Sequence, residues 1–514
     1  MVVILVLLVG AYALYRILDT GEEGPSEETG SSSPKVEALV EVEADNVDTV
    51  TITNAEDQIV LKSERFTPTP TPTPEDYVPV TGKAEEEPKP IQKWIWEGEA
   101  PVGLDQGKLD SLGKNLMRLS SIEDLGEKET EALAEYGLDK AQASLKYALN
   151  NGDSIEVLLG NQVQSASSSQ YYAYNKTTKR LGVVSSPAQY MLTTRYDLME
   201  NKLVPYNAYE LKGFDLTRLG EPYPIKAKNL APLSHEDSMD EEKLHEAKAE
   251  WQLESPVSWA GNSNTILAFL TELQDLQADS FLPYKEEDLA KYGLDTPQYQ
   301  LSLEGENGTI QYAFGQSVSG DVRYGMVEGQ DRIFSYKAQD LSKIGAKTLE
   351  FYDRFAALVN IQDAGKLTVD LDQDGVYVSD IFHPSKEEEE AAGDKELEPT
   401  YTLNGKDANV KNASDKKLFS KYYQAVIGVR FAGIDKEANP SADDAAVYKI
   451  TYEMRTDKDD IRLAFTKRDD KTLYVFKDGV YTGFYADIMD FEDNGDLDSP
   501  SVKLALQELE KAIN

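Results

Sequence analysis

The sequence predicts an α+β protein in which an N-terminal transmembrane helix precedes tandem repeated α+β units with mainly antiparallel sheets. Three observations lead to this prediction. The chain opens with an apolar run, a Tyr-Gly-Leu-Asp tetrad starts at residue 136 and again at residue 292, and alternating segments joined by turn residues recur. For a chain of 514 residues, domains of about 100–200 residues predict three or four units. We divide the chain into an anchor, a flexible linker, two repeat units and a third, divergent unit: 1–18, 19–39, 40–205, 206–360 and 361–514.

The apolar run at the N-terminus extends to Leu18 and is close to the roughly 20 residues that a membrane-spanning helix needs. A polar, acidic stretch follows and is typical of a flexible spacer. We therefore expect a single-pass protein of the cell membrane with the bulk of the chain extracytoplasmic. A cleaved signal peptide is the alternative, because Ala11-Tyr12-Ala13 fits a small-x-small cleavage site. Arg16 lies near the C-terminal end of this run, on the wrong side for an N-terminus that stays inside, so we expect a short basic leader before the run.

The charge of the chain argues against several classes of partner. Lys and Arg number 52 against 92 Asp and Glu, which gives a net charge of −40. Such a field repels nucleic acids and anionic lipid headgroups, so no nucleic-acid partner is expected. It is compatible with divalent cations or a basic partner, although solubility alone accounts for it. The chain has no cysteine, which excludes disulfides, thiol nucleophiles and thiolate metal sites.

The surroundings of the two tetrads match as well. A helical pattern precedes each tetrad, at 109–135 and at 266–291. A strand, a turn and a second strand ending in glycine follow, at 143–160 and 299–315, with Asn-Gly at both turns. Aromatic strands come next, and each copy closes with a helix-like stretch, over 188–204 and 338–359.

Each unit is also predicted to open with a hairpin. The hairpins lie at 48–62, near 207–219 and at 366–382, and a tryptophan-led strand follows in the first two units, at Trp94 and Trp251. The third unit keeps a helix at 416–434 and strands at 447–454, 461–467 and 472–484, but has lost the tetrad. Insertions at 67–90, 231–250 and 383–399 are expected to be solvent loops, the first Pro-rich and extended, the second possibly helical.

The search for chemistry finds no catalytic group. His235, His245 and His383 lie in the insertions without converging ligands, and no serine elbow, phosphate loop or dinucleotide fingerprint occurs. Asp370, Asp372 and Asp374, followed by Gly375, match the first half of a calcium loop. The closing glutamate is missing, because the twelfth position is Ile381, and Asp374-Gly375 also suits a hairpin turn. We therefore interpret these residues as a turn and keep them as weak metal candidates.

The tetrads receive a structural interpretation. In Tyr136-Gly137-Leu138-Asp139 and Tyr292-Gly293-Leu294-Asp295, we expect Leu to fill the core, Gly to turn the chain out of the helix and Asp to cap the turn. No base or nucleophile accompanies either tetrad. We expect neither a cofactor nor an enzymatic activity.

The order of hairpin, Trp strand, helices, Tyr-Gly-Leu-Asp-x-Pro, paired strands and Gly resembles the bacterial DUF4340 family of domains of unknown function. The second copy, with Thr296-Pro297 after its tetrad, fits best, whereas the first has Lys140-Ala141. The similarity covers most of residues 40–360. It implies an N-terminal membrane helix and association with ABC-transporter permeases and gliding-motility-type auxiliary proteins. It offers no catalytic residues.

Two functions of different class follow as expectations. The first is a non-enzymatic, extracytoplasmic, membrane-tethered scaffold or accessory component of an ABC-type transport system, with a permease or an auxiliary subunit as partner. The alternative is a surface protein that binds a ligand or glycan through aromatic sheet faces or acidic loops. A cell-wall enzyme is a third possibility and requires a deep cleft with converging carboxylates.

Overall fold

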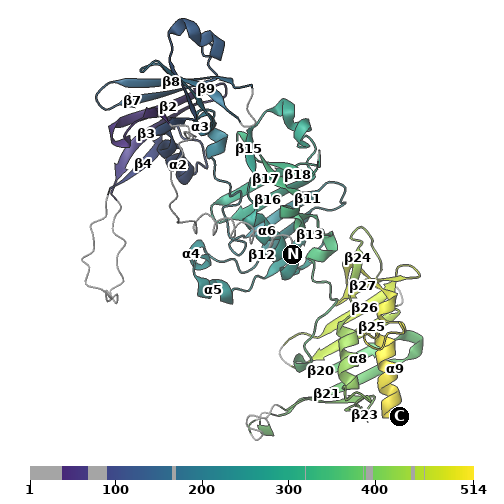
Figure 1. Cartoon of the computed structure of the whole chain (residues 1–514). Helices are drawn as coiled ribbons and strands as arrows, with labels where there is room; N and C mark the ends of the chain where they lie inside the picture. Colours follow the sequence, from purple (N-terminus) through teal and green to yellow (C-terminus); the bar gives the residue numbers. More distant parts are fainter. Residues whose placement is uncertain are drawn as a thin grey trace, which may run out of the picture. The chain divides into compact units, whose positions relative to one another are not determined.

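The computed structural model describes residues 37–67, 90–164, 169–318, 320–385, 387, 388, 390, 397–441, 446–455 and 458–514. The chain divides into two compact bodies, an N-terminal body that ends at Met199 and a C-terminal body that begins at Glu200. The predicted α+β class with antiparallel sheets is confirmed (Figure 1). The predicted anchor (1–18) and most of the predicted linker and Thr-Pro insertion lie outside the described residues. Among the helices that are described, none combines the length and apolar character needed to span a membrane.

The N-terminal body is built on an eight-stranded antiparallel sheet in the order β4-β3-β2-β7-β8-β9-β10-β6. A short two-stranded ribbon of β1 and β5 accompanies it. The strands span Glu37–Glu41 (β1), Val47–Asn54 (β2), Gln58–Phe66 (β3), Ile91–Trp96 (β4), Arg118–Ser121 (β5), Glu123–Glu127 (β6), Ala143–Leu149 (β7), Ser154–Gln162 (β8), Tyr171–Asn175 (β9) and Arg180–Val184 (β10). Strand β1 thus begins inside the range predicted as linker.

Helices α2 (Gln106–Leu116) and α3 (Ser186–Met191) cover one face of this sheet (Figure 1). Helix α2 starts where the Asp105 carboxylate accepts hydrogen bonds from the backbone N–H groups of the first turn. Leucines three and four residues apart then point into the core. The Tyr147 hydroxyl crosses this core to donate to the Leu116 carbonyl at 2.6 Å, and burial raises the pKa of Tyr147.

The C-terminal body holds two nine-stranded antiparallel sheets. The second sheet has the order β14-β13-β12-β11-β16-β17-β18-β19-β15. Its strands span Gly213–Arg218 (β11), Ile225–Asn229 (β12), Trp251–Ser255 (β13), Trp259–Ala260 (β14), Ser280–Pro283 (β15), Tyr299–Gly305 (β16), Gly308–Phe314 (β17), Val322–Val327 (β18) and Arg332–Lys337 (β19). Helix α6 (Ser263–Asp275) packs on it, and α4 (His235–Ser238) and α5 (Glu241–Glu246) lie in the insertion predicted to be helical.

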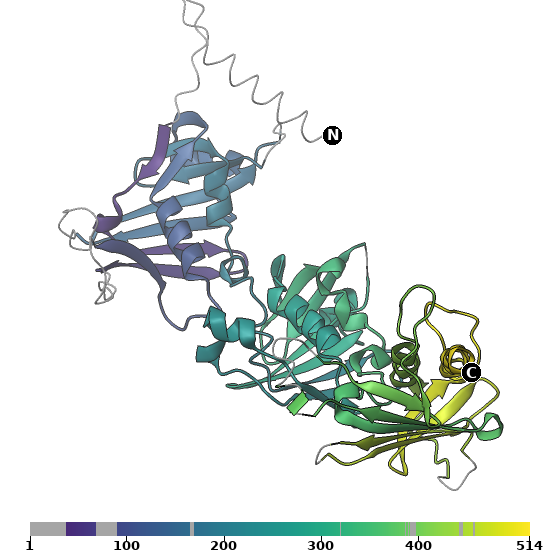
Figure 2. The ribbon, with the colours of Figure 1, turned by 90° about the horizontal axis from the view of Figure 1, so that it is seen from below.

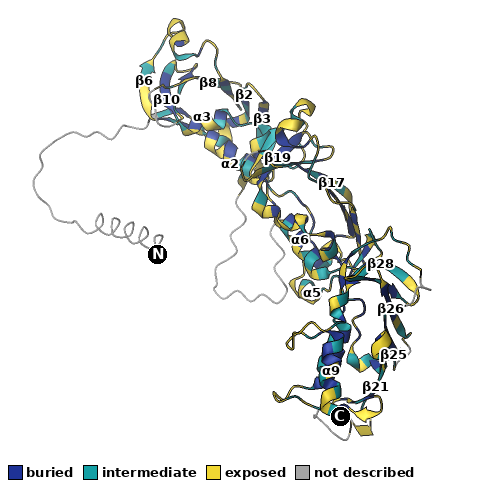
Figure 3. Ribbon diagram, turned by 90° about the vertical axis from the view of Figure 1, so that its right-hand side faces the viewer, coloured by how far each residue is buried: buried dark blue, intermediate teal, exposed yellow. Residues whose placement is uncertain are grey.

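The third sheet repeats the same plan, with the order β23-β22-β21-β20-β25-β26-β27-β28-β24. Its strands span Ala364–Asp370 (β20), Val376–Phe382 (β21), Thr400–Leu403 (β22), Lys406–Asp407 (β23), Phe431–Ile434 (β24), Tyr448–Met454 (β25), Ile461–Lys467 (β26), Thr472–Lys477 (β27) and Val480–Asp487 (β28). Helices α8 (Leu418–Ile427) and α9 (Val502–Ile513) lie side by side over one face (Figures 1 and 2). The residues of α9 that face the sheet are buried (Figure 3).

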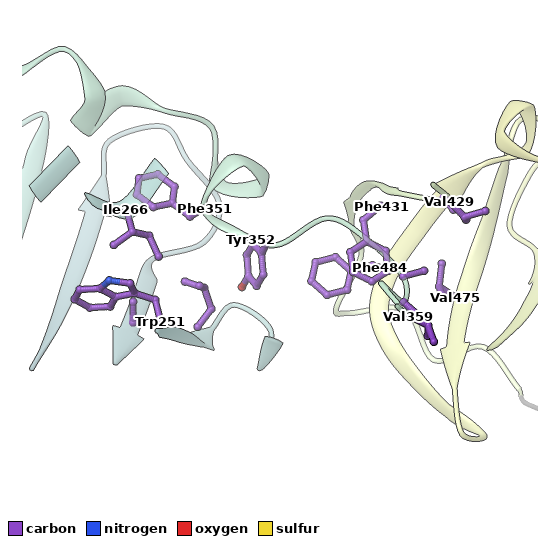
Figure 4. Packing of buried hydrophobic residues seen from close by; sticks show 14 of the residues in the cluster. Trp251, Ile266, Phe351, Tyr352, Val359, Val429, Phe431, Val475 and Phe484 are labelled. Carbon is purple, nitrogen blue, oxygen red and sulfur yellow. The ribbon is translucent and has the colours of Figure 1, made fainter. Parts of the chain in front are cut away.

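A belt of aromatic side chains joins the second and third sheets (Figure 4). The Phe484 ring stacks on Phe431 with centroids 4.1 Å apart, and the edge of Tyr352 meets Phe484 at 5.2 Å. Trp259 contacts the same two phenylalanines. The two sheets therefore share one hydrophobic core.

Several predicted helices are shorter than expected. The pattern over 109–135 was predicted to be helical, but the helix ends at Leu116, and β5, β6 and a 3₁₀ helix, η2 (Thr130–Tyr136), follow. Strand β6 pairs with β10 and β5 with β1, so sheet pairing outweighs the local helical pattern. In 266–291 the helix similarly ends at Asp275, before β15 and the 3₁₀ helix η4 (Glu286–Tyr292).

The closing stretches also differ from the prediction. Within 188–204 only the end of α3 and a 3₁₀ turn at Arg195–Leu198 are helical, and 338–359 contains three 3₁₀ turns. The predicted helix 416–434 ends at Ile427, and its last residues form β24 on the edge of the third sheet.

Candidate functional site

Both tetrads end a 3₁₀ helix with a left-handed glycine. Gly137 closes η2 with φ of +70° and Gly293 closes η4 with φ of +68°. A residue with a Cβ is strained in this region, whereas glycine is not. The N–H of Leu138 then bonds to the Leu133 carbonyl at 3.1 Å, and that of Leu294 to Leu289 at 2.9 Å. Each glycine therefore turns the chain out of a helix as predicted, but the helix that it ends is a 3₁₀ helix.

The tetrad leucines fill small clusters on the face of the sheet opposite to the α-helices. Leu138 and Leu294 are 3% and 5% exposed, yet they belong to satellite clusters and not to the main core. Tyr136 meets Tyr172 edge-on at 5.0 Å, and Tyr292 meets Tyr324 at 4.8 Å. Each tetrad therefore packs on the face of its sheet that the α-helices leave open.

The glycine that follows the paired strands fits directly against the tetrad. A Cβ on Gly160 would lie 2.3 Å from the Tyr136 carbonyl oxygen, and a Cβ on Gly315 would lie 2.6 Å from that of Tyr292. Real Cβ atoms do not approach backbone this closely. The N–H of Gln316 also donates to the Gly293 carbonyl at 3.0 Å. The tetrad and the distant glycine form one packing unit.

The predicted role of the tetrad aspartates is wrong. Asp139 and Asp295 are exposed, and neither carboxylate accepts a hydrogen bond from the residues that the structure describes. The turn is held by backbone hydrogen bonds and by the left-handed glycine.

Beside the second tetrad, the open face of the second sheet is hollowed. Two adjoining hollows of about 550 and 440 Å³ both include Asp215 and Ser302, and together we call them the sheet-face trough. The trough crosses β11, β12, β16, β17 and β18, which lie together in Figure 1. At one end, Ala313 and Met326 line the trough and also pack against the tetrad cluster. The trough therefore ends beside the cluster that contains the tetrad.

The floor of the trough includes a glycine with large neighbours. Gly213 pairs with Lys228 on β12 and with Glu304 on β16. A Cβ at Gly213 would lie 2.8 Å from the Ala227 carbonyl oxygen. Lysine and glutamate side chains from the neighbouring strands line the trough around Gly213. One of these lysines, Lys226, pairs with Glu254 at 3.6 Å. The trough therefore offers both donors and acceptors without a dominant charge.

The end of the trough beside the tetrad cluster is lined mainly by neutral polar side chains, with Asp215 and Glu328 beside them. Thr217 on β11, Gln300 on β16 and Gln311 on β17 belong to the second hollow, next to Met326. Amides and hydroxyls of this kind bind polar main-chain or hydroxyl groups, and a methionine nearby adapts to apolar groups. Such a surface suits recognition.

The calcium-like residues lie in the hairpin that joins β20 to β21. Asp372–Asp374 form a 3₁₀ turn, and the Asp370 carboxylate accepts the N–H of Asp372 at 3.1 Å. Lys503 of α9 places its ammonium 2.6 Å from Asp374 and 2.7 Å from Glu492. Lys449 lies 3.4 Å from Asp370. Lysine side chains therefore balance the negative charge of Asp370 and Asp374 in this turn. In the described part of the chain, no group of three or more acidic or histidine side chains is placed to hold a metal ion.

Replacing Lys503 by glutamine is expected to lower the free energy of unfolding by about 1 kcal/mol, because the Asp374 and Glu492 carboxylates, which are 56% and 38% exposed, lose a counter-charge that is itself largely buried. The side chain of Lys503 is only 16% exposed. Burial lowers its pKa, but the bonds to Asp374 and Glu492 outweigh this and the net shift of the pKa is upward. Urea unfolding measures the loss. Lys511→Gln, an exposed change on the same helix, should leave stability unchanged; equal effects of the two changes would contradict the role of the ion pairs.

The histidines are separate from one another. His235 Nδ1 lies 3.0 Å from the Glu210 carboxylate, and His383 Nε2 lies 2.8 Å from the Ala364 carbonyl oxygen. His245 lies in α5. These positions offer no converging metal ligands among the described residues.

Comparison with known proteins places the repeat in a family. The DUF4340 family model, a domain of unknown function, matches residues 94–250 and 251–404. No curated protein and no solved structure matches the chain. The first match holds although the first tetrad lacks the proline of the second.

The matched segments and the sheets have different boundaries. The first segment begins in β4 and ends after β11 and β12, which are strands of the second sheet. The second begins at β13 and ends after β20, β21 and β22, which are strands of the third sheet. Together the two segments cover more than half of the sequence. The chain belongs to the DUF4340 family and carries two tandem copies of its domain.

Proposed function

We propose that this protein is a non-enzymatic, membrane-tethered, extracytoplasmic accessory or scaffold component of an ABC-type transport system. The sheet-face trough is the observation that carries the proposal. Each large sheet has its α-helices on one face, and in the second sheet the other face presents a hollowed polar surface. Donors and acceptors spread over several strands suit a protein partner, which binds over a broad area, more than a small substrate.

The N-terminal apolar run and the family resemblance give the proposal its cellular setting. An apolar run of this length would tether the chain to a membrane. The association of the family with ABC-transporter permeases supplies the expected partner. Tandem copies on one tether would hold several such sheets beside the same membrane complex.

Co-purification from membranes tests the proposal. The full chain, captured under conditions that keep known membrane complexes intact, should recover a permease or an auxiliary subunit. Ser302→Arg, placed where the two hollows of the trough meet, should reduce that recovery about tenfold, because a central charged side chain blocks the surface. Ser154→Arg, on an exposed position of β8, is the matched control. Absence of any transport component from the captured material would reject the proposal.

A second candidate is a surface protein that binds a glycan or another polar ligand. The mainly neutral end of the trough favours it, because Thr217, Gln300 and Gln311 offer the paired donors and acceptors that hydroxyl-rich ligands use. Binding on a glycan array that Ser302→Arg abolishes supports this candidate. A blank array, together with a calcium titration that shows no binding, removes it.

A further inference from the structure

The third sheet carries a cleft of unusual charge for this acidic chain. The cleft lies between α8 and the segment 489–501 that leads into α9, and it encloses about 730 Å³. Residues spaced three and four apart on α8 form one wall, namely Lys417, Ser420, Lys421, Gln424 and Gly428. We call it the basic cleft.

The cations of the basic cleft differ in whether they have an acidic partner. Lys417 pairs with Glu398, and the charge of Arg430 acts on the Asp490 carboxylate. For Lys416 and Lys421 no ion pair is found within the described residues, and both belong to the lining of the cleft. Lys421 donates only to the Leu497 carbonyl oxygen, at 3.0 Å. Acidic residues outnumber basic residues by 92 to 52 in this chain. A cleft lined with lysine and arginine is therefore unusual, and its charge favours the binding of an external anion.

The acids that line the basic cleft compensate these cations only in part. The Asp490 carboxylate accepts the backbone N–H of Arg430 at 3.0 Å, so it is engaged by the main chain. Burial raises the pKa of Asp490 above its ordinary value, whereas the bond from the Arg430 backbone and the Arg430 charge lower it. Asp498 is the other acid in the lining. Helix α9 also begins at the cleft, and the positive end of its dipole adds to the field.

The remaining lining points to a peptide and not to a purely ionic polymer. Gln424 carries a side-chain amide that can donate and accept, as a peptide backbone requires. The Asn494 amide already donates to the Ser499 carbonyl at 2.9 Å and accepts from the Asp496 N–H at 3.2 Å, which leaves its second N–H and its second lone pair. Met489, which is 47% exposed, and Pro500 add an apolar rim. Helix α8 alone is about 15 Å long, and the cations extend from Lys416, before it begins, to Arg430, after it ends. The length of the helix matches about five residues of extended chain.

We propose that the basic cleft binds an extended acidic peptide segment of a protein partner. The inference stands apart from the proposed transport function, because it concerns a different surface and its test needs only purified protein. Carboxylates of the partner would meet Lys416, Lys421 and Arg430, while its backbone bonds to Gln424 and Asn494.

The test measures fluorescence anisotropy of a labelled 20-residue oligo-glutamate with the purified full chain. The net charge of −40 suppresses non-specific binding of a polyanion, so binding reports a local basic site. Binding should weaken between about 50 and 200 mM salt. The double variant Lys421→Gln/Arg430→Gln should weaken it about tenfold, and Lys416→Gln, on an exposed side chain, should weaken it about threefold.

A matched control carries the same charge change in the N-terminal body. Lys140→Gln/Lys146→Gln alters two exposed lysines and should leave the affinity unchanged. No binding of oligo-glutamate, or an equal loss in the control pair, overturns the proposal. Labelled inorganic polyphosphate is the comparison probe. If it binds while oligo-glutamate does not, the site recognises phosphate and the peptide proposal is wrong.

Discussion

Replacing Phe484 by alanine is expected to lower the free energy of unfolding of the C-terminal body by about 3–5 kcal/mol. The ring is 0% exposed and stacks on Phe431 at 4.1 Å, with Tyr352 and Trp259 at its edges. Its removal leaves a cavity between the second and third sheets, where aromatic pairs add to the burial energy. No neighbouring side chain can fill the space without leaving its own contacts.

Urea unfolding of the full chain, monitored by intrinsic fluorescence, measures this loss. Phe382→Ala is the matched control, because Phe382 lies on a strand of the same body and is 55% exposed; its effect should stay within about 0.5 kcal/mol. Phe484→Leu should fall between the two. If Phe484→Ala and Phe382→Ala shift the transition equally, the aromatic belt does not couple the sheets.

Replacing Gly315 by alanine is expected to destabilise the C-terminal body by about 2–3 kcal/mol. The new Cβ would lie 2.6 Å from the Tyr292 carbonyl oxygen and 3.1 Å from that of Gly293. Both obstacles are backbone atoms of the tetrad, so relief requires the 3₁₀ turn to move off the sheet. Gly160→Ala should act in the same way on the N-terminal body, where the Tyr136 carbonyl oxygen is 2.3 Å from the added atom.

Thermal unfolding followed by circular dichroism checks this prediction. Gly365→Ala is a suitable control, because Gly365 also lies in a strand and its Cβ would meet its nearest neighbour at 3.6 Å, an ordinary contact. The control should be neutral or slightly stabilising, since alanine restricts the unfolded chain. A Gly315→Ala protein as stable as the control would show that the tetrad and the glycine are not one packing unit.

The sequence predicted the hairpins and the repeat because their signals are local. Asn151-Gly152 and Asn307-Gly308 mark turns between alternating strands, and the structure has β7–β8 and β16–β17 there. Helical patterns were less reliable. Residues 118–127 have apolar side chains every third position, at Leu119, Ile122 and Leu125. They nevertheless form β5 and β6, because they pair with strands that are distant in the sequence. Helix α9 was not predicted, although its apolar residues recur at helical spacing.

The candidate sites depend on pairing that local patterns do not contain. The trough arises because Gly213 lies between Lys228 and Glu304, residues 15 and 91 positions away along the chain. The basic cleft likewise brings α8 against the segment 489–501, and nothing in either segment alone indicates the other. The tetrads were recognisable as a repeat, but their contact with Gly160 and Gly315 follows only from the fold.

Each family segment begins within one sheet and ends within the next, and this arrangement affects how such a chain can gain or lose copies of the segment. Residues 37–93 supply an opening half-sheet, the two matched segments follow, and residues from 405 onward supply a closing half. Duplicating one segment in tandem would add one complete sheet, because each segment finishes the sheet before it and starts the next. Gain or loss of a whole segment can therefore lengthen or shorten the protein without leaving an incomplete sheet, so that the number of copies is free to vary while the two ends stay fixed.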